Sequence, residues 1–238
     1  MNETLAIGSL MFEVRRSSRR KALGLTVDRH GELLVHAPEG EPNRHIETWV
    51  HSKLLWVHRR LAAKEWLTSA LREPEFVSGE SFSVLGRRYP LRIDPAQEEP
   101  LRFDGRKFHL STQAVPEAAC HFRTWFIGTG RVWVRNRVVL LSRKVGCSPV
   151  RTDVRDLGHR WGSCGRNGVL YVNWRTIQLP VQLVDYVLVH ELSHLIEPTH
   201  GPEFWQVMDR AMPNWRDRRE ELGRKASEVF WCTAEMGQ

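Results

Sequence analysis

The chain has 238 residues, four cysteines and a formal net charge of +7. This length suffices for one large domain or two small ones with a buried core. The cysteines form no C-x-x-C pair, so neither a disulfide framework nor a zinc knuckle is expected. No apolar run approaches the roughly 18 residues of a membrane span, and residues 1–12 lack the basic start of a signal peptide. We therefore expect a cytoplasmic protein that does not enter a membrane.

The positive charge is spread along the chain rather than gathered in one block. It is densest in residues 15–21, 131–144, 151–160 and 216–225. Such charge attracts polyanions, so weak binding of nucleic acid or nucleotide through a basic surface is one expectation. The alternative is a solvated basic surface that has no such partner.

The first 110 residues are typical of a β-rich part with one long helix. Short apolar runs predict strands, with a turn at residues 28–31, over residues 12–14, 23–27 and 33–35. Apolar residues at helical spacing then predict a helix from Asn43 to about Leu71. Further short runs predict strands over residues 82–85, 88–93, 101–103 and 107–110.

Residues 111–238 are predicted to form a helix-dominated part with a small sheet. The pattern is helical from Val115 to about Val145, with Gly128 and Gly130 as points where the helix can break. Two strands are expected over residues 151–157 and 169–172, followed by helices over residues 181–196, 202–212 and 215–226. The predicted class is α+β, divided into parts 1–110 and 111–238.

The helix predicted over residues 181–196 carries three side chains that can do chemistry. It is apolar on nearly every side after Asp185, which predicts that it is buried. His190 and His194 are four residues apart, so both imidazoles project from one face, with Glu191 beside them. Such groups are costly to bury without partners, and a metal ion supplies one. The H-E-x-x-H spacing is typical of zinc peptidases.

One Zn²⁺ ion fits this pattern. A catalytic zinc ion is tetrahedral, takes imidazole nitrogen at about 2.0–2.1 Å and keeps one position open for water. Pro198 ends the helix, so a short turn can bring His200 back as the third ligand. Glu220 or Glu221 is the alternative third ligand. Glu191 is predicted to be the general base that takes a proton from the attacking water.

Several segments together resemble a known family. They are Leu85–Tyr89, Arg160–Cys164, Asn173–Arg175, Pro180, His190–His194, His200 and Phe204–Trp205. In this combination, over nearly its whole length, the chain resembles the YgjP-like metallopeptidases, a group of small bacterial zincins with SprT-like relatives. The resemblance implies a zincin-like domain, three histidine ligands and a catalytic Glu191. It does not supply a substrate.

Residues near the predicted zinc site are candidates for substrate binding. Trp161 precedes a segment that could line a groove, where an extended peptide would pair with an edge strand. Arg160 and Arg175 could stabilise an oxyanion or a phosphate. The alternatives are a packing role for Trp161 and surface ion pairs for both arginines. Cys164 is either a fourth metal ligand, which would close the site, or a buried thiol.

The sequence therefore predicts a zinc-dependent hydrolase, with a metallopeptidase acting on an unidentified peptide or protein as the first interpretation. Two other functions stay open. One is a metal-dependent hydrolase of a nucleotide or another phosphoanhydride, which the arginines would recognise. The other is a DNA-associated, SprT-like protease or nucleic-acid-binding module, whose DNA binding would fall steeply with salt.

Overall fold

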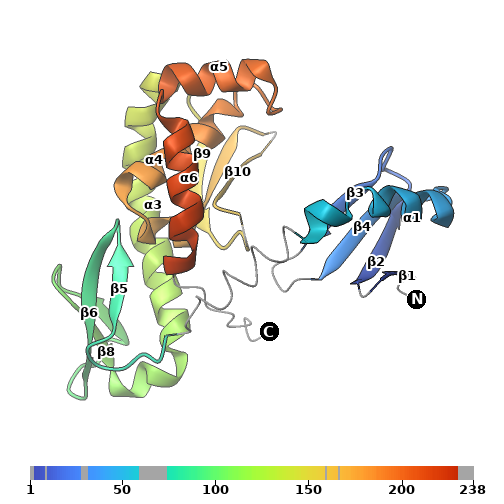
Figure 1. Ribbon diagram of the computed structural model, residues 1–238. Helices are drawn as coiled ribbons and strands as arrows, with labels where there is room; N and C mark the ends of the chain where they lie inside the picture. The colour runs from blue at the N-terminus through green and yellow to red at the C-terminus, as the bar shows by residue number, and fades with distance from the viewer. Residues whose placement is uncertain are drawn as a thin grey trace. The chain divides into compact units, whose positions relative to one another are not determined.

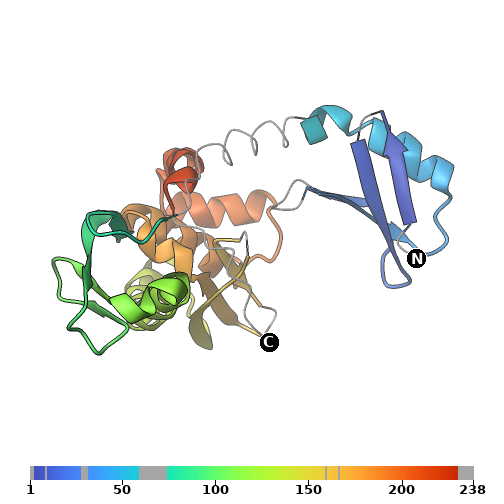
Figure 2. The same cartoon turned by 90° about the horizontal axis from the view of Figure 1, so that it is seen from below.

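The computed structural model describes residues 3–8, 10–27, 32–58, 74–158, 160–165 and 167–229. The chain divides into two compact units, residues 1–70 and 71–238. Their elements can be followed in Figures 1 and 2. Both units combine helices and strands, which confirms the predicted α+β class. In the part of the chain that is described, no helix is both long and apolar enough to cross a bilayer.

The first unit is a four-stranded sheet with a helix. In spatial order, the strands are β1 (Glu3–Ile7), β2 (Leu10–Ser17), β4 (Leu33–Pro38) and β3 (Gly24–Val27). β2 and β4 are parallel, and the other neighbours are antiparallel. Helix α1 (Asn43–His51) buries Ile46 and Val50 in the core of this sheet. The helix predicted from Asn43 to about Leu71 is interrupted after α1, and residues 54–58 are helical again. The expected end of this helix and the turn predicted at residues 28–31 lie outside the described residues.

The second unit begins with another four-stranded sheet. Its strands, in spatial order, are β5 (Ser81–Val84), β6 (Arg87–Asp94), β8 (Phe108–Ser111) and β7 (Leu101–Phe103). Phe82 and Phe108 pack on Phe122 of the next helix, with ring centroids 4.1 and 5.0 Å apart. This sheet therefore shares a core with the helices, and the division after residue 110 that the sequence suggested falls inside the second unit.

Helix α3 (Ala118–Val145) follows the short 3-10 helix η1 (Thr112–Glu117) and runs unbroken through Gly128 and Gly130. Gly130 is a packing glycine, because a Cβ there would lie 2.9 Å from Ile177 Cγ1. The helix ends at Gly146, whose φ of +86° is the left-handed conformation that favours glycine at a C-terminal cap. Gly130 therefore permits close packing on Ile177, and neither Gly128 nor Gly130 breaks the helix.

A three-stranded sheet and three helices complete the unit. The sheet order is β10 (Gly162–Cys164), β11 (Val169–Asn173) and β9 (Arg151–Arg155), with β9 and β11 parallel. After the 3-10 helix η2 (Trp174–Gln178) come α4 (Val181–Ser193), α5 (Pro202–Ala211), α6 (Trp215–Lys225) and the 3-10 helix η3 (Ala226–Glu228). α4 packs against α3, α5, α6 and β10. β10 and the two 3-10 helices were not predicted, whereas β9, β11 and the three α-helices were.

An ion pair joins α3 to α4. Arg137 Nε and Nη2 donate to the two carboxylate oxygens of Asp185, each over 2.6 Å. This fork geometry fixes both separation and rotation, because a guanidinium and a carboxylate match two bonds at once. The pair therefore holds the first turns of α4 against the long helix, below the segment that carries the histidines.

Candidate metal centre

Helix α4 is buried over most of its length and places two histidines at its C-terminal end. Pro180 stands at its N-terminal cap, where the missing N–H costs nothing. The turn between β5 and β6 abuts this start, since a Cβ on Gly86 would lie 2.7 Å from Pro180 Cα. His194 is the C-terminal cap residue, so His190 and His194 face the turn that follows the helix.

That turn returns His200 to the other two imidazoles. The three-histidine cluster (His190, His194 and His200) has one nitrogen per ring within 4.8 Å of the nitrogens of the others. His190 Nε2 and His200 Nε2 are 3.1 Å apart. His194 Nδ1 lies 3.1 Å from the carbonyl oxygen of Glu197. A bond from Nδ1–H to that carbonyl leaves the Nε2 lone pair of His194 free for the cluster.

Two aromatic residues of α5 support the cluster. The fully buried Phe204 ring lies 4.6–5.0 Å, between centroids, from each of the three imidazoles. Trp205 Nε1 donates to the His200 carbonyl over 3.1 Å, which ties the returning turn to α5. Trp205 also stacks on Trp215 of α6 at 4.4 Å. The imidazoles are therefore held by packing from a helix that is itself braced.

The environment keeps two of the imidazoles, those of the partly buried His190 and His194, neutral. Burial lowers the pKa of His190 to about 3, helped by the neighbouring His194 and His200. Burial also lowers the pKa of His194. His190 Nδ1 is buried without a hydrogen-bond partner among the residues that the structure describes. Neutral imidazoles expose nitrogen lone pairs, and lone pairs are what a metal ion requires.

Glu191 sits beside the cluster and is 9% exposed. Burial raises the pKa of its carboxyl to about 7, against the opposing effects of the Cys164 backbone N–H and of Arg160. Gly162 of β10 packs directly on this side chain, since a Cβ there would lie 2.6 Å from Glu191 Cγ and 2.9 Å from Oε1. The missing side chain at residue 162 is therefore what leaves room for the carboxyl group.

A pocket of about 230 Å³ opens where His190 and Glu191 meet the segment 160–162. Tyr186 and Val187 of α4 and Leu222 of α6 complete its wall. The pocket thus brings a buried carboxyl, one imidazole of the cluster and an exposed arginine to one small space.

Residues 21–225 match a family described as YgjP-like, metallopeptidase domain. The chain belongs to the YgjP-like metallopeptidase family. This membership makes it a metal-dependent peptidase by type, and it confirms the family predicted from the motifs. The chain is also similar to the crystal structure of the metallopeptidase zymogen of Pyrococcus abyssi abylysin, with 19% identity, a TM-score of 0.37, and coverage of 39% of this chain and 93% of that one. No curated protein matches.

In this YgjP-like chain, Arg160 and Trp161, which the sequence made candidates for substrate binding, both line the pocket. Asn173, which is fully buried, anchors the segment: its side-chain amide donates to the carbonyls of Gly158 and Arg160 over 3.0 and 2.7 Å. Thr176 Oγ1 donates to the Trp161 carbonyl over 3.0 Å. Sequence reasoning placed Asn173 in the family signature without giving it this role.

Arg175 has a different position from the one considered for a substrate residue. It is 1% exposed, and its Nη1 donates to Asp156 Oδ1 over 2.9 Å and to the Gly158 carbonyl over 3.1 Å. Trp174 Nε1 donates to the same carboxylate over 3.2 Å. The Arg175 guanidinium thus hydrogen-bonds to the loop after β9, and Arg175 is not among the residues that line the pocket.

The alternative metal ligands lie apart from the cluster. Glu220 pairs with Arg224 over 2.7 Å, and Glu221 pairs with Arg218 over 2.9 Å. Among the described residues, the ligand atoms that lie close enough together to hold one metal ion are those of the three histidines. Glu220, Glu221 and Cys164 are not among them. Burial raises the pKa of the Cys164 thiol, which disfavours the thiolate that would ligate a metal.

Proposed function

We propose that this chain is a zinc peptidase, in which His190, His194 and His200 hold one Zn²⁺ ion and Glu191 is the general base. The observation that carries the proposal is the convergence of three imidazoles, with one nitrogen of each within 4.8 Å of the others, at a place where His190 and the buried Glu191 carboxyl line one pocket. Membership of the family supports the coarser statement, a metal-dependent peptidase. The zinc, the base and the substrate residues are our inference.

The residues present fit a zinc ion. Two nitrogen ligands of one tetrahedral zinc ion at about 2.0–2.1 Å are roughly 3.3 Å apart, and the Nε2 atoms of His190 and His200 are 3.1 Å apart. All three donors are imidazoles, two of them kept neutral by burial. Three protein donors, without a fourth among the described residues, match a catalytic site rather than a closed structural one.

When bound, a zinc ion would polarise a substrate carbonyl and lower the pKa of water. Glu191 would then move the proton: its carboxylate accepts a proton from the attacking water and passes it to the leaving amine nitrogen. A pKa of about 7 suits both transfers near neutral pH, because such a group gives and takes protons with equal ease. The Cys164 backbone N–H and Gly162 hold the carboxyl group in place for this transfer.

Arg160 and Trp161 support binding of a peptide at the pocket. Both line it, and the buried Asn173 fixes the backbone that carries them. The exposed Arg160 guanidinium is suited to a carbonyl oxygen or a carboxylate of an extended peptide. We propose these two residues, without Arg175, as the substrate-binding residues.

The test compares Glu191→Gln with Glu220→Gln on the full chain. Glu220 is an exposed glutamate on α6, so its variant controls for the loss of one carboxylate. We expect Glu191→Gln to lower peptidase kcat by roughly 10²–10⁴-fold with unchanged zinc content, since this is the usual size of general acid–base catalysis. Unlabelled peptide libraries and nucleoside triphosphates are supplied in parallel. Full activity of Glu191→Gln, or hydrolysis of triphosphates in place of peptides, would contradict the proposal.

A further inference from the structure

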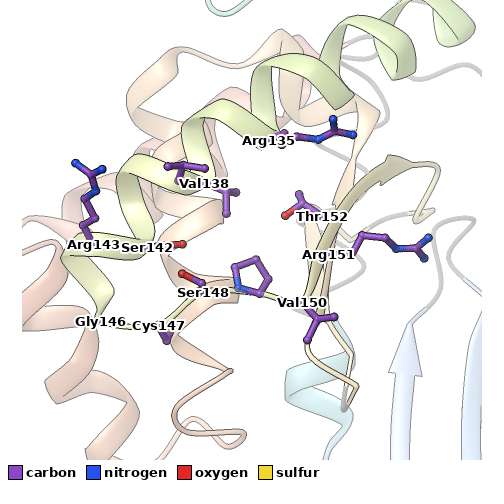
Figure 3. A pocket seen from close by; sticks show the side chains of 12 residues that line it. Arg135, Val138, Ser142, Arg143, Gly146, Cys147, Ser148, Val150, Arg151 and Thr152 are labelled. Atoms are coloured by element: carbon purple, nitrogen blue, oxygen red, sulfur yellow. The ribbon is translucent and has the colours of Figure 1, made fainter.

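A groove of about 870 Å³ lies between the C-terminal half of α3 and the segment that leads into β9 (Figure 3). It belongs to the second unit and flanks β9, the sheet edge opposite to β10. The groove is thus separate from the pocket at Glu191, with which it shares no lining residue. Its size is in the range of sites that take a ligand.

Two exposed valines give the groove an apolar part. Val139 on α3 and Val150 just before β9 both line it, and they are 56% and 81% exposed. Pro149 lies next to Val150 in the same wall. Apolar side chains on both walls favour a partner that brings apolar groups of its own, because covering them removes apolar surface from water.

The groove also holds a hydroxyl that lacks a partner. Ser142 is 7% exposed, and its Oγ has no hydrogen-bond partner among the described residues. Figure 3 shows this oxygen directed from α3 into the space between α3 and the segment before β9. A buried polar atom without a partner is unfavourable, so a ligand that offers it a hydrogen bond gains affinity.

Three arginines surround the groove. Arg135 and Arg143 come from α3 and Arg151 from β9. Within the described part of the chain, none of the three pairs with a carboxylate, whereas Arg131 nearby is paired with Asp153. Arg135 and Arg143 are eight residues apart, which is about 12 Å along a helix at 1.5 Å per residue. This separation calls for a partner with several anionic groups.

The backbone of β9 adds a row of hydrogen-bonding groups. Val150 N–H bonds to the Gly168 carbonyl, so alternate residues from Val150 onward face β11. The N–H and C=O of Arg151 and Asp153 then point to the other side of the strand. No further strand pairs with that side in the described residues. Such an edge can accept an extended chain as an additional strand.

We propose that this groove is a docking site for an extended acidic peptide segment that carries apolar residues between its carboxylates. In an extended chain, residues four apart are about 13 Å apart, which matches the spacing of Arg135 and Arg143. A nucleic acid fits less well, because single strands are bound by aromatic stacking and the groove has no aromatic side chain in its lining. The site goes beyond the proposed zinc chemistry and does not depend on it.

The test measures binding to the full chain by fluorescence anisotropy. One labelled probe is an eight-residue peptide in which valine and glutamate alternate. The others are the same peptide with lysine for glutamate and a labelled twelve-nucleotide single-stranded DNA. The double variant Arg143→Glu/Arg151→Glu is compared with Arg102→Glu/Arg106→Glu, which makes the same charge change at exposed residues outside the groove. Val150→Glu tests the apolar wall with a side chain that is already exposed.

We expect the acidic peptide to bind the wild type and to lose at least about tenfold in affinity in Arg143→Glu/Arg151→Glu and in Val150→Glu. The Arg102→Glu/Arg106→Glu control should stay within about twofold of the wild type, and the lysine peptide should not bind. Absence of acidic-peptide binding, or equal losses in both double variants, would overturn the proposal. DNA binding that is lost in the groove variants, without peptide binding, would assign the groove to nucleic acid instead.

Discussion

The contact between Gly162 and Glu191 makes one substitution especially informative. In Gly162→Ala, the new Cβ would lie 2.6 Å from Glu191 Cγ, 2.9 Å from Oε1 and 3.0 Å from Cδ. Ordinary carbon contacts begin near 3.5 Å, so the carboxyl group has to move by about 1 Å. Glu191 is 9% exposed and packs in α4, so this movement displaces the carboxyl from the place where we propose it transfers protons.

A displacement of about 1 Å costs a catalytic group roughly 100-fold in rate, which is about 2.7 kcal/mol of transition-state stabilisation. We therefore expect kcat of Gly162→Ala to fall about 100-fold. The three atoms nearest to the added Cβ all belong to Glu191 and none to the three-histidine cluster, so the zinc content should stay at the wild-type level.

The assay combines turnover of a fluorogenic peptide with zinc analysis and thermal unfolding of the same samples. Gly128→Ala is the matched control, because it also adds one methyl group and no heavy atom lies within 4 Å of the added Cβ. In a helix, this change should stabilise the fold by up to about 1 kcal/mol and leave kcat unchanged. Wild-type kcat in Gly162→Ala, or a loss of zinc together with activity, would refute the reasoning about Glu191.

The remaining predictions concern the support of the site and the folded state. Phe204→Ala removes the ring beneath the three-histidine cluster, so urea unfolding should show a loss of about 3–5 kcal/mol and zinc titration a weaker affinity. Asp185→Ala leaves Arg137 unpaired between α3 and α4, and the free energy of unfolding should fall by about 2 kcal/mol. A hydrogen bond from His109, with backbone N–H groups, holds the pKa of Asp104 well below 3.8. The ionised Asp104 carboxylate therefore stabilises the fold above pH 3.8, and this stabilisation is lost as the pH falls below 3.8. The urea midpoints of the wild type and of Asp104→Asn should therefore converge in acid.

The three-histidine cluster could be predicted because the spacing of its residues is local. His190 and His194 are one helical turn apart, so the period of the helix alone brings their imidazoles to one face. His200 is six residues further on, after the turn at Pro198. A connection this short leaves the chain few ways to run, so His200 stays near the end of the helix. The structure brings the three imidazoles together at the place that this reasoning gave.

The surroundings of Glu191 could not be predicted in the same way. Gly162 precedes it by 29 residues, and their contact exists because β10 pairs with β11 and α4 packs on β10. Likewise, Arg160 and Arg175 are chemically identical in a sequence. Only the folded chain shows that Arg175 is buried in an ion pair with Asp156, whereas Arg160 is exposed.

The division of the chain depends on contacts of the same long range. The strands of residues 81–111 look like a continuation of the β-rich beginning, because strand patterns carry no mark of the core that they join. In the structure, Leu85 N–H donates to the Ile177 carbonyl over 2.7 Å and Phe82 packs on Phe122. These contacts tie the sheet to the helical unit, ahead of the helix that carries the histidines.

The zinc content of the purified full chain, wild type beside His194→Ala, tests the central claim most directly. His194 lies at the end of α4 with its Nδ1 against the Glu197 carbonyl, so its removal takes away one donor and leaves the core of the helix intact. We predict one equivalent of zinc in the wild type and none in His194→Ala after dialysis against a weak chelator. Equal zinc in the two proteins, or none in a folded wild type supplied with zinc, would contradict the account.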